Sequence, residues 1–167
     1  MQVAIDLNKS EVEIYEECFV ILEHLIISSD KIISNLSNYI ALMKQAFSKI
    51  SWIGFYIREN DKLFLGPFQG KTACTEILIG NGVCGTSAHI RETIIVNNVN
   101  EFAGHIACDS SSKSEIVIPI IINEQVWGVL DIDSSAIGSF STMDKNYLEK
   151  QIELLTKKLN LDEFVLQ

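Results

Sequence analysis

Apolar residues recur at helical spacing over the first fifty positions. Between residues 10 and 29 they fall every three or four positions, at Val12, Tyr15, Cys18, Phe19, Leu22 and Leu25. Ser10 precedes Glu13 by three residues, which is the spacing of a capping box. A second stripe covers about 31 to 47, with Ser29 or Asp30 as candidate N-cap and Ile32, Ile33, Leu36, Ile40, Leu42 and Met43 on its apolar side. The pattern predicts two amphipathic helices.

From residue 51 the pattern changes to short runs of aromatic and β-branched residues, which are typical of strands. Strands are expected at 51–57, 63–68, 75–79, 93–96, 115–122 and 125–133, with a short helix at 85–91 and a closing helix at 140–159. This order predicts an α+β fold in which helices pack against one face of an antiparallel sheet. We expect one domain over 1–167, with N-terminal helices in 1–48, the sheet and its loops in 51–134, and the closing helix at 140–159.

The last two predicted strands carry three carboxylates. Side chains alternate faces along a strand, so Trp127, Val129, Asp131 and Asp133 should share one face, and Val126, Gly128, Leu130 and Ile132 the other. A three-residue turn at Asn123–Gln125 would place Glu115 opposite Asp133, whereas a two-residue turn would send it to the other face. If these carboxyl groups lie past the edge of the sheet, water solvates them. If they are enclosed together, like-charge repulsion and desolvation raise the pKa of at least one of them.

Charge and cysteine content narrow the functional classes. The chain has 167 residues and a net charge of -9, which argues against a nucleic-acid or anionic membrane surface, because both require clustered Lys and Arg. No signal peptide is visible at the N-terminus, and the apolar tracts are too short to span a membrane. We therefore expect a cytoplasmic protein whose four cysteines are thiols.

One polar loop carries the strongest chemical signal. Residues Gly104–Asp109 read Gly-His-Ile-Ala-Cys-Asp and lie before a serine cluster. Cys108 is a candidate nucleophile there, because a nearby imidazole such as His105 can lower a thiol pKa. The alternative is a buried small hydrophobe, which is our interpretation of Cys18. Cys84 lies near the expected start of the short helix, a position that favours a thiolate.

Metal and nucleotide motifs are weak. The cysteines lack the two-residue spacing of structural zinc sites, so we expect no bound metal, and a site built from Cys74, Cys84, Cys108 and His105 is a minor alternative. The glycines at 80–85 lack the Gly-Lys-Ser/Thr ending of a phosphate loop. Neither motif therefore supports a function.

Several motifs taken together resemble the free methionine-(R)-sulfoxide reductases, which are single-domain GAF proteins. They lie between about Trp52 and Phe140: Gly-Pro-Phe-Gln-Gly-Lys at 66–71, Cys74, Gly-Val-Cys-Gly-Thr at 82–86, Gly-His-Ile-Ala-Cys-Asp at 104–109, Ser-Glu-Ile-Val at 114–117, and Gly-Val-Leu-Asp-Ile-Asp-Ser at 128–134. The resemblance implies a GAF-type antiparallel sheet with the N- and C-terminal helices packed on one face.

The resemblance also implies roles for individual residues. Cys108 matches the catalytic cysteine of the family, and Cys74 and Cys84 match its recycling cysteines. Of these two we take Cys74 as the main partner of Cys108, while which of them acts first stays open. The acidic residues that bind and activate the substrate are matched by Glu115, Asp131 and Asp133. The substrate-binding positions are matched by Trp52, with Tyr56 nearby, and by the backbone of Ile106 and Ala107.

The reaction implied is the thiol-dependent reduction of free L-methionine-(R)-sulfoxide. A carboxylic acid protonates the sulfoxide oxygen, Cys108 becomes a sulfenic acid, and an intramolecular disulfide follows, which an external dithiol such as thioredoxin reduces. No bound cofactor is required. The long N-terminal helices suggest a homodimer.

Two other functional classes fit the sequence less well. A GAF module that only binds a small ligand, such as a cyclic nucleotide, would not need motif cysteines beside a carboxylate pair. A purely structural oligomerisation domain would leave Asp131, Asp133 and the loop of Cys108 without a purpose. Turnover of the sulfoxide distinguishes the enzyme from both.

Overall fold

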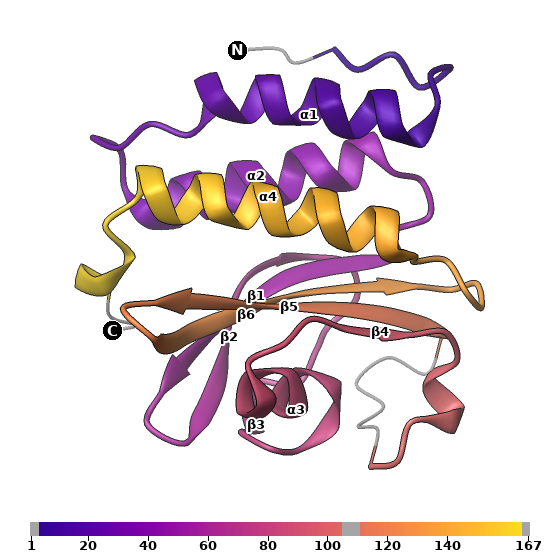
Figure 1. Cartoon of the computed structure of the whole chain (residues 1–167), viewed down its shortest axis with the longest axis vertical. Helices are drawn as coiled ribbons and strands as arrows, with labels where there is room; N and C mark the ends of the chain where they lie inside the picture. The colour runs from indigo at the N-terminus through magenta and orange to yellow at the C-terminus, as the bar shows by residue number, and fades with distance from the viewer. Residues whose placement is uncertain (1–3, 105–110, 165–167) are drawn as a thin grey trace.

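The computed structural model of the chain describes residues 4–104 and 111–164. Over these ranges it has a six-stranded antiparallel sheet in the order β3-β2-β1-β6-β5-β4 (Figure 1). The strands are β1 (Trp52–Glu59), β2 (Lys62–Gln69), β3 (Glu76–Leu78), β4 (Ile94–Val96), β5 (Ser114–Ile122) and β6 (Gln125–Ser134). The helices are α1 (Glu11–Leu25), α2 (Ile32–Ala46), α3 (Gly82–Ile90) and α4 (Thr142–Lys158), with 3-10 turns at Val99–Glu101 and Leu161–Glu163.

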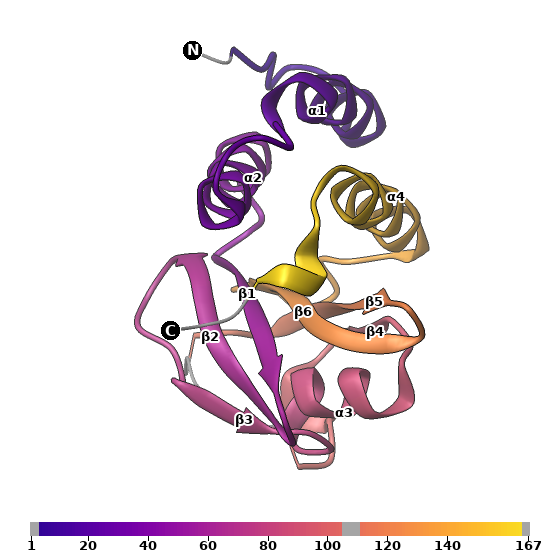
Figure 2. The ribbon, with the colours of Figure 1, turned by 90° about the vertical axis from the view of Figure 1, so that its left-hand side faces the viewer.

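The helices divide between the two faces of the sheet. Helices α2 and α4 cover one face, and α1 packs on both of them as an outer layer (Figures 1 and 2). Of the four α-helices in the described ranges, α3 is the one on the opposite face. The predicted α+β fold, with the N- and C-terminal helices on one face, is confirmed. None of the helices in the described ranges is long and apolar enough to cross a membrane.

The predicted capping box of α1 is confirmed, whereas the predicted cap of α2 is wrong although the helix starts within one residue of the predicted position. Ser10 and Glu13 form a reciprocal capping box at the first turn of α1. Helix α2 begins after Lys31, with no side-chain cap from Ser29 or Asp30. The buried side chain of Asn35 instead reaches back and bonds the backbone N–H and carbonyl of Ile27, each at 2.9 Å. These bonds fix the start of α2 to the loop that precedes it.

The main core lies between the sheet and the three covering helices. Cys18 is fully buried on α1, as predicted, among residues such as Leu22, Leu36 and Met43. The inward side of the sheet contributes Phe55, Leu130 and Ile132. Two of the residues predicted on apolar stripes, Val12 and Ile33, are instead about two-fifths exposed. The opposite face of the sheet has its own smaller apolar cluster beneath α3.

The hairpin between β5 and β6 sets the register of the carboxylates. Its turn has two residues, Asn123 and Glu124, both with positive φ, which is the geometry of a tight hairpin. Ile120 pairs with Gly128 and Ile121 pairs with Val126, so β6 contains one extra residue at Trp127. The bulge shifts the register by one, and Glu115 lies opposite Asp133 although the turn is the shorter one.

The same bulge overturns part of the predicted strand pattern. Trp127 was expected on the face of Asp131, but it packs with the helix-side core, and its Nε1 donates to the carbonyl of Leu161 at 2.9 Å. Val126 packs with the cluster beneath α3. From Gly128 onward the predicted alternation holds, because the extra residue lies before it. Asp131 and Asp133 therefore share the face that α3 covers.

Candidate active site

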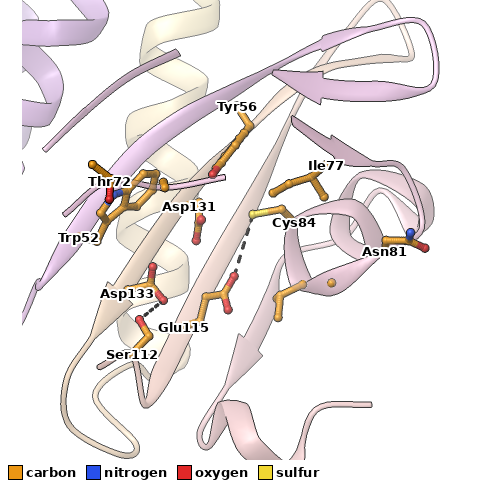
Figure 3. Close-up of a pocket in the computed structure, with 13 residues that line it drawn as sticks. Trp52, Tyr56, Thr72, Ile77, Asn81, Cys84, Ser112, Glu115, Asp131 and Asp133 are labelled. Carbon is orange, nitrogen blue, oxygen red and sulfur yellow. Dashed lines mark hydrogen bonds between the residues drawn. The ribbon is translucent and has the colours of Figure 1, made fainter. Parts of the chain in front are cut away.

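A pocket opens on the face of the sheet beneath α3 (Figure 3). Its floor comes from β1, β5 and β6, and its walls come from the first turn of α3 and the loop before β3. The lining residues are Trp52, Tyr56, Thr72, Ala73, Ile77, Asn81, Gly82, Val83, Cys84, Ser112, Glu115, Asp131 and Asp133. Residues from six stretches of the chain thus meet at one place.

The three predicted carboxylates converge in this pocket. Glu115 and Asp133 are direct cross-strand partners on β5 and β6, and Asp131 lies two residues before Asp133 on the same face. Glu115 is 6% exposed and Asp131 is 7% exposed. Two carboxyl groups are therefore almost wholly removed from water, with one oxygen of each within 4.8 Å of the other.

Burial changes the acidity of both groups. Loss of solvation, followed by the charge of Asp133, raises the pKa of Asp131 well above its usual range. Loss of solvation, followed by the charge of Asp131, does the same to the pKa of Glu115. Because two such groups repel each other when both are ionised, the arrangement favours one shared proton on the pair. The pocket thus contains a carboxylic acid that can donate a proton.

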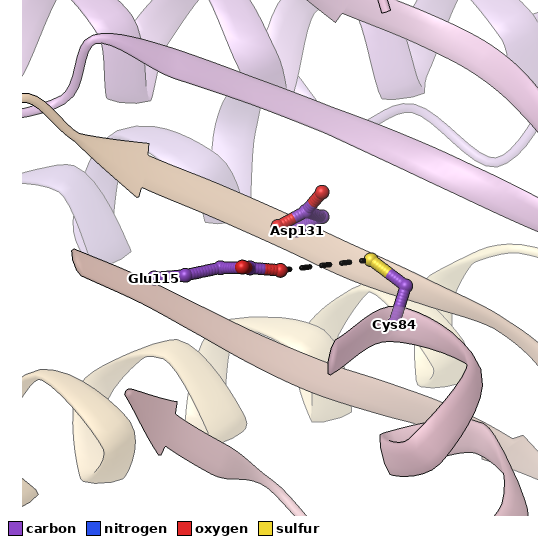
Figure 4. Close-up of side chains that lie close together, drawn as sticks. All are labelled: Cys84, Glu115 and Asp131. Atoms are coloured by element: carbon purple, nitrogen blue, oxygen red, sulfur yellow. Dashed lines mark hydrogen bonds between the residues drawn. The ribbon is translucent and has the colours of Figure 1, made fainter. Parts of the chain in front are cut away.

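Cys84 joins the pair from α3. The helix begins at Gly82, three residues earlier than expected, so Cys84 lies in its first turn. Its Sγ is 4.0 Å from Glu115 Oε1 (Figure 4). Burial, followed by the charges of Asp131 and Glu115, raises the pKa of this thiol well above its usual range. The predicted thiolate at the helix start is wrong, because desolvation and two carboxyl groups outweigh the helix dipole.

The carboxylates differ in their hydrogen bonds. Asp133 is partly exposed, and its Oδ1 accepts a 2.5 Å hydrogen bond from the hydroxyl of Ser112. Asp131 Oδ1 is buried and has no hydrogen-bond partner among the residues that the structure describes. A buried acceptor without a partner is rare in folded proteins. This atom is therefore placed to receive a group from a ligand.

Trp52 forms the apolar wall of the pocket. Its ring stacks between Tyr56, with centroids 6.1 Å apart, and Phe68, at 5.6 Å, while its Nε1 donates to the carbonyl of Lys71. A Cβ atom at Gly54 or at Gly70, where φ is +136°, would come within 2.4 Å of the indole. The two glycines thus leave room for the ring and fix its plane.

Tyr56 lies beside Trp52 on the same face, as predicted. Its hydroxyl donates to the carbonyl of Cys74 at 3.0 Å, so it also holds the loop before β3. Cys74 itself is disulfide-bonded in the structure, whereas Cys18 and Cys84 are thiols. The predictions for Cys108, His105, Ile106 and Ala107 lie outside the described residues.

Several residues that line the pocket or position the predicted site residues were not predicted from the sequence. Ser112 belongs to a serine cluster that was treated only as loop, and its bond to Asp133 depends on a tertiary contact. Gly54 offered a usable signal, because a glycine inside an aromatic strand often marks a close approach. Thr72 and Asn81 also line the pocket, and nothing in their sequence context indicates it.

Comparison with known proteins agrees with this site. The GAF domain family model matches residues 29–157. The free methionine-R-sulfoxide reductase of Escherichia coli strain K12 is 43% identical over 132 residues, which cover 79% of this chain and 80% of that protein. The protein of the same name from Saccharomyces cerevisiae is 44% identical over 158 residues, covering 90% of this chain and 88% of that protein.

The likeness extends to three-dimensional structure. An X-ray structure of the free methionine-R-sulfoxide reductase from Neisseria meningitidis, in complex with its substrate, superposes with a TM-score of 0.89 at 36% sequence identity. The match covers 94% of this chain and 95% of that one. Sequence, fold and the buried carboxylates therefore agree, and the chain belongs to the free methionine-R-sulfoxide reductase family of GAF-domain proteins.

Proposed function

We propose that this protein reduces free L-methionine-(R)-S-oxide to L-methionine. Relatives at 43% and 44% identity carry that activity in their names, and one solved at 36% identity holds its substrate. The observation that carries the proposal is the buried pair of Glu115 and Asp131 in the same pocket as Trp52. A proton donor for the sulfoxide oxygen and an aromatic wall for the methyl group suit a methyl sulfoxide as substrate.

The carboxyl pair supplies the proton. A sulfoxide is a weak electrophile until its oxygen is protonated, and a carboxylic acid that keeps its proton at neutral pH can protonate it. Glu115 and Asp131 both have a raised pKa because they are buried together. Either can hold the shared proton, so we assign donation to the pair and not to one member.

The third carboxylate explains the preference for a free amino acid. Asp133 is partly exposed and is held by Ser112, so it is placed to pair with the α-ammonium group of the substrate. A methionine inside a peptide has an amide there instead and carries no positive charge. Trp52, the cross-strand neighbour of Asp133, then packs against the methylsulfinyl end of the side chain.

Cys108 is our proposed nucleophile. Its thiolate attacks the protonated sulfoxide, the oxygen passes to the cysteine sulfur, and methionine leaves reduced by two electrons. Cys108 is left as a sulfenic acid. The thiol of a second cysteine then displaces water from it and forms a disulfide. We propose Cys74 as that partner, because Cys74 is disulfide-bonded in the structure while Cys84 is a buried thiol of raised pKa.

An external dithiol completes the cycle. A reductant of the thioredoxin type gives two electrons and two protons to the disulfide and becomes a disulfide itself. Both protein thiols are then restored. The net result returns oxidised free methionine to the amino-acid pool, which is a defence against oxidative damage in a reducing compartment such as the cytoplasm.

The test is turnover of free L-methionine-(R)-S-oxide with dithiothreitol as reductant. We expect methionine from the free R epimer, and none from the S epimer or from a peptide-bound sulfoxide. Cys108→Ala should abolish turnover, while Cys18→Ala, which removes the buried thiol on the other side of the sheet, should keep the rate within about twofold. Normal turnover by Cys108→Ala, or equal rates for free and peptide-bound substrate, would contradict the proposal.

A further inference from the structure

Three side chains in the pocket could together hold a metal ion. The Sγ of Cys84, one oxygen of Glu115 and one oxygen of Asp131 all lie within 4.8 Å of one another (Figure 4). The three residues come from α3, β5 and β6 respectively. All three are buried, so the cluster is not a set of solvated surface acids.

An independent observation points to a ligand between them. Asp131 is 7% exposed, and its Oδ1 has no hydrogen-bond partner in the described part of the chain. An acceptor that is buried without a partner destabilises the folded state. A cation placed between the three side chains would satisfy this oxygen directly.

We propose that Cys84, Glu115 and Asp131 form a binding site for one thiophilic divalent cation of the zinc class. The proposal rests on the proposed function only for its consequence, which is inhibition. An ion held by Glu115 and Asp131 occupies the oxygens that would hold the catalytic proton, and it blocks the floor of the pocket. The site therefore allows thiophilic metals to switch the enzyme off reversibly.

The donor set selects the class of metal. Zinc combines one thiolate with oxygen ligands readily, with Zn–S of about 2.3 Å and Zn–O of about 2.0–2.2 Å. Those bond lengths place tetrahedral donors about 3.5 Å apart, and Cys84 Sγ is already 4.0 Å from Glu115 Oε1. Small side-chain rotations close the remaining gap. Magnesium and calcium require more oxygen ligands and avoid thiolate, so they fit this set poorly.

The fourth position of such an ion faces the pocket. Three protein ligands with one open position is the arrangement of a zinc site that exchanges its fourth ligand with solvent or substrate. A site of this kind releases its ion to a chelator more easily than a closed structural site does. Inhibition should accordingly be reversed by EDTA.

The disulfide form of the protein offers the cleanest test. In it Cys74 is disulfide-bonded, and the described thiols are Cys18 and Cys84. We would titrate this form with Cd²⁺, a spectroscopic stand-in for Zn²⁺, and follow the ultraviolet sulfur-to-metal charge-transfer band. We expect one equivalent to bind with a band from a single thiolate, and the band to disappear on adding EDTA. Competition with Zn²⁺ should remove it, whereas Mg²⁺ should not.

Matched variants decide which residues bind. Cys84→Ala should abolish the band, while Cys18→Ala should leave both the band and the stoichiometry unchanged. Asp131→Asn and Glu115→Gln should each weaken binding at least tenfold while keeping the fold, checked by circular dichroism. Each of three results would overturn the proposal: no band, a band that survives in Cys84→Ala, or unchanged affinity in both carboxyl variants.

The readout also separates this proposal from the proposed function. Metal binding is measured without substrate and without turnover, so a protein that binds Cd²⁺ but reduces no sulfoxide would fail only the proposed function. A protein that reduces the sulfoxide but shows no band would fail only the metal site. Inhibition of the pre-reduced enzyme by Zn²⁺, reversed by EDTA, would link the two.

Discussion

Two buried aspartates, one on each side of the sheet, differ in their hydrogen-bond partners and in the direction of their pKa shifts. Asp144 on α4 is 1% exposed and Asp131 on β6 is 7% exposed. Asp144 accepts hydrogen bonds from Tyr15 Oη at 2.9 Å, from Lys49 Nζ at 2.7 Å and from the backbone of Ser141 at 2.8 Å. Asp131 faces Glu115, Asp133 and Cys84 instead, and one of its oxygens has no described partner.

The acidities of the two groups follow from those partners. Burial alone would raise the pKa of Asp144, but the bonds from Lys49, Ser141 and Tyr15 outweigh it and lower that pKa. Burial and a like charge both raise the pKa of Asp131. On the helix side, the buried carboxylate of Asp144 therefore links α1, α4 and the chain before β1. On the pocket side, the carboxyl group of Asp131 lies beside other carboxyl groups, which is an unfavourable arrangement but a suitable one for proton transfer. Sites of this kind commonly cost stability.

The largest expected effect comes from removing the proton on the pocket side. Asp131→Asn should lower kcat/KM for the free R sulfoxide by roughly 100-fold or more, because loss of a proton donor costs about that factor. The melting temperature should not fall. Steady-state kinetics and thermal melts of the same preparation would check both. A variant with near-normal kcat/KM would show that Asp131 is not part of the proton-donating pair.

The reverse pattern is expected on the helix side. Asp144→Ala should lower the free energy of unfolding by about 3 kcal/mol, because Lys49 and Tyr15 would lose their shared buried partner. The KM should stay unchanged, since the site is on the other face of the sheet. Urea unfolding would measure the loss, with the exposed Asp162→Ala as a control expected to change stability by less than about 0.5 kcal/mol. An Asp144→Ala protein as stable as the wild type would contradict a stabilising role for Asp144.

The pH dependence of stability should separate the two aspartates by sign. The raised pKa of Asp131 means that the folded state keeps its proton above pH 4, so stability is lost as pH rises toward the folded pKa. The lowered pKa of Asp144 does the opposite, and its contribution is lost as pH falls through the folded value. Asp131→Asn should therefore gain stability over the wild type as pH rises from about 4 to neutral.

Urea unfolding at several pH values, with EDTA present so that no metal contributes, would measure the gap in unfolding free energy between Asp131→Asn and the wild type. A gap that does not change with pH would mean that Asp131 does not titrate abnormally. A gap that narrows as pH rises would reverse the sign and contradict the assignment of the proton to the pocket side.

The smallest effect is expected at the other buried thiol. Cys18 packs in the helix-side core, and burial raises its pKa to about 12. Cys18→Ala should cost about 1 kcal/mol of stability through the small cavity it leaves and should leave kcat/KM unchanged. Thiol alkylation of the folded wild type at pH 8, followed by peptide mapping, should leave Cys18 unmodified. Rapid alkylation there would show that this core opens readily.

Local patterns in the sequence were sufficient for most of the fold. The capping box at Ser10, the spacing of Tyr15, Cys18 and Leu22, and the strand runs depend on neighbours within a few residues, so they can be recognised without a structure. The motif that contains Asp131 and Asp133 also placed both on one face correctly, because alternation along a strand is local. The family followed from the same ordered motifs.

Tertiary structure alone decided the properties on which the chemistry depends. Glu115 faces Asp133 only because a bulge at Trp127 corrects a two-residue turn, and a bulge is fixed by packing on both faces of the sheet. The pKa of the Cys84 thiol is raised because α3 buries it against carboxyl groups from two strands of the sheet. Asp131 and Asp144 have the same side chain, but the pKa of Asp131 is raised and that of Asp144 is lowered. A pKa depends on the surroundings of a group, and the chain brings these surroundings together only on folding.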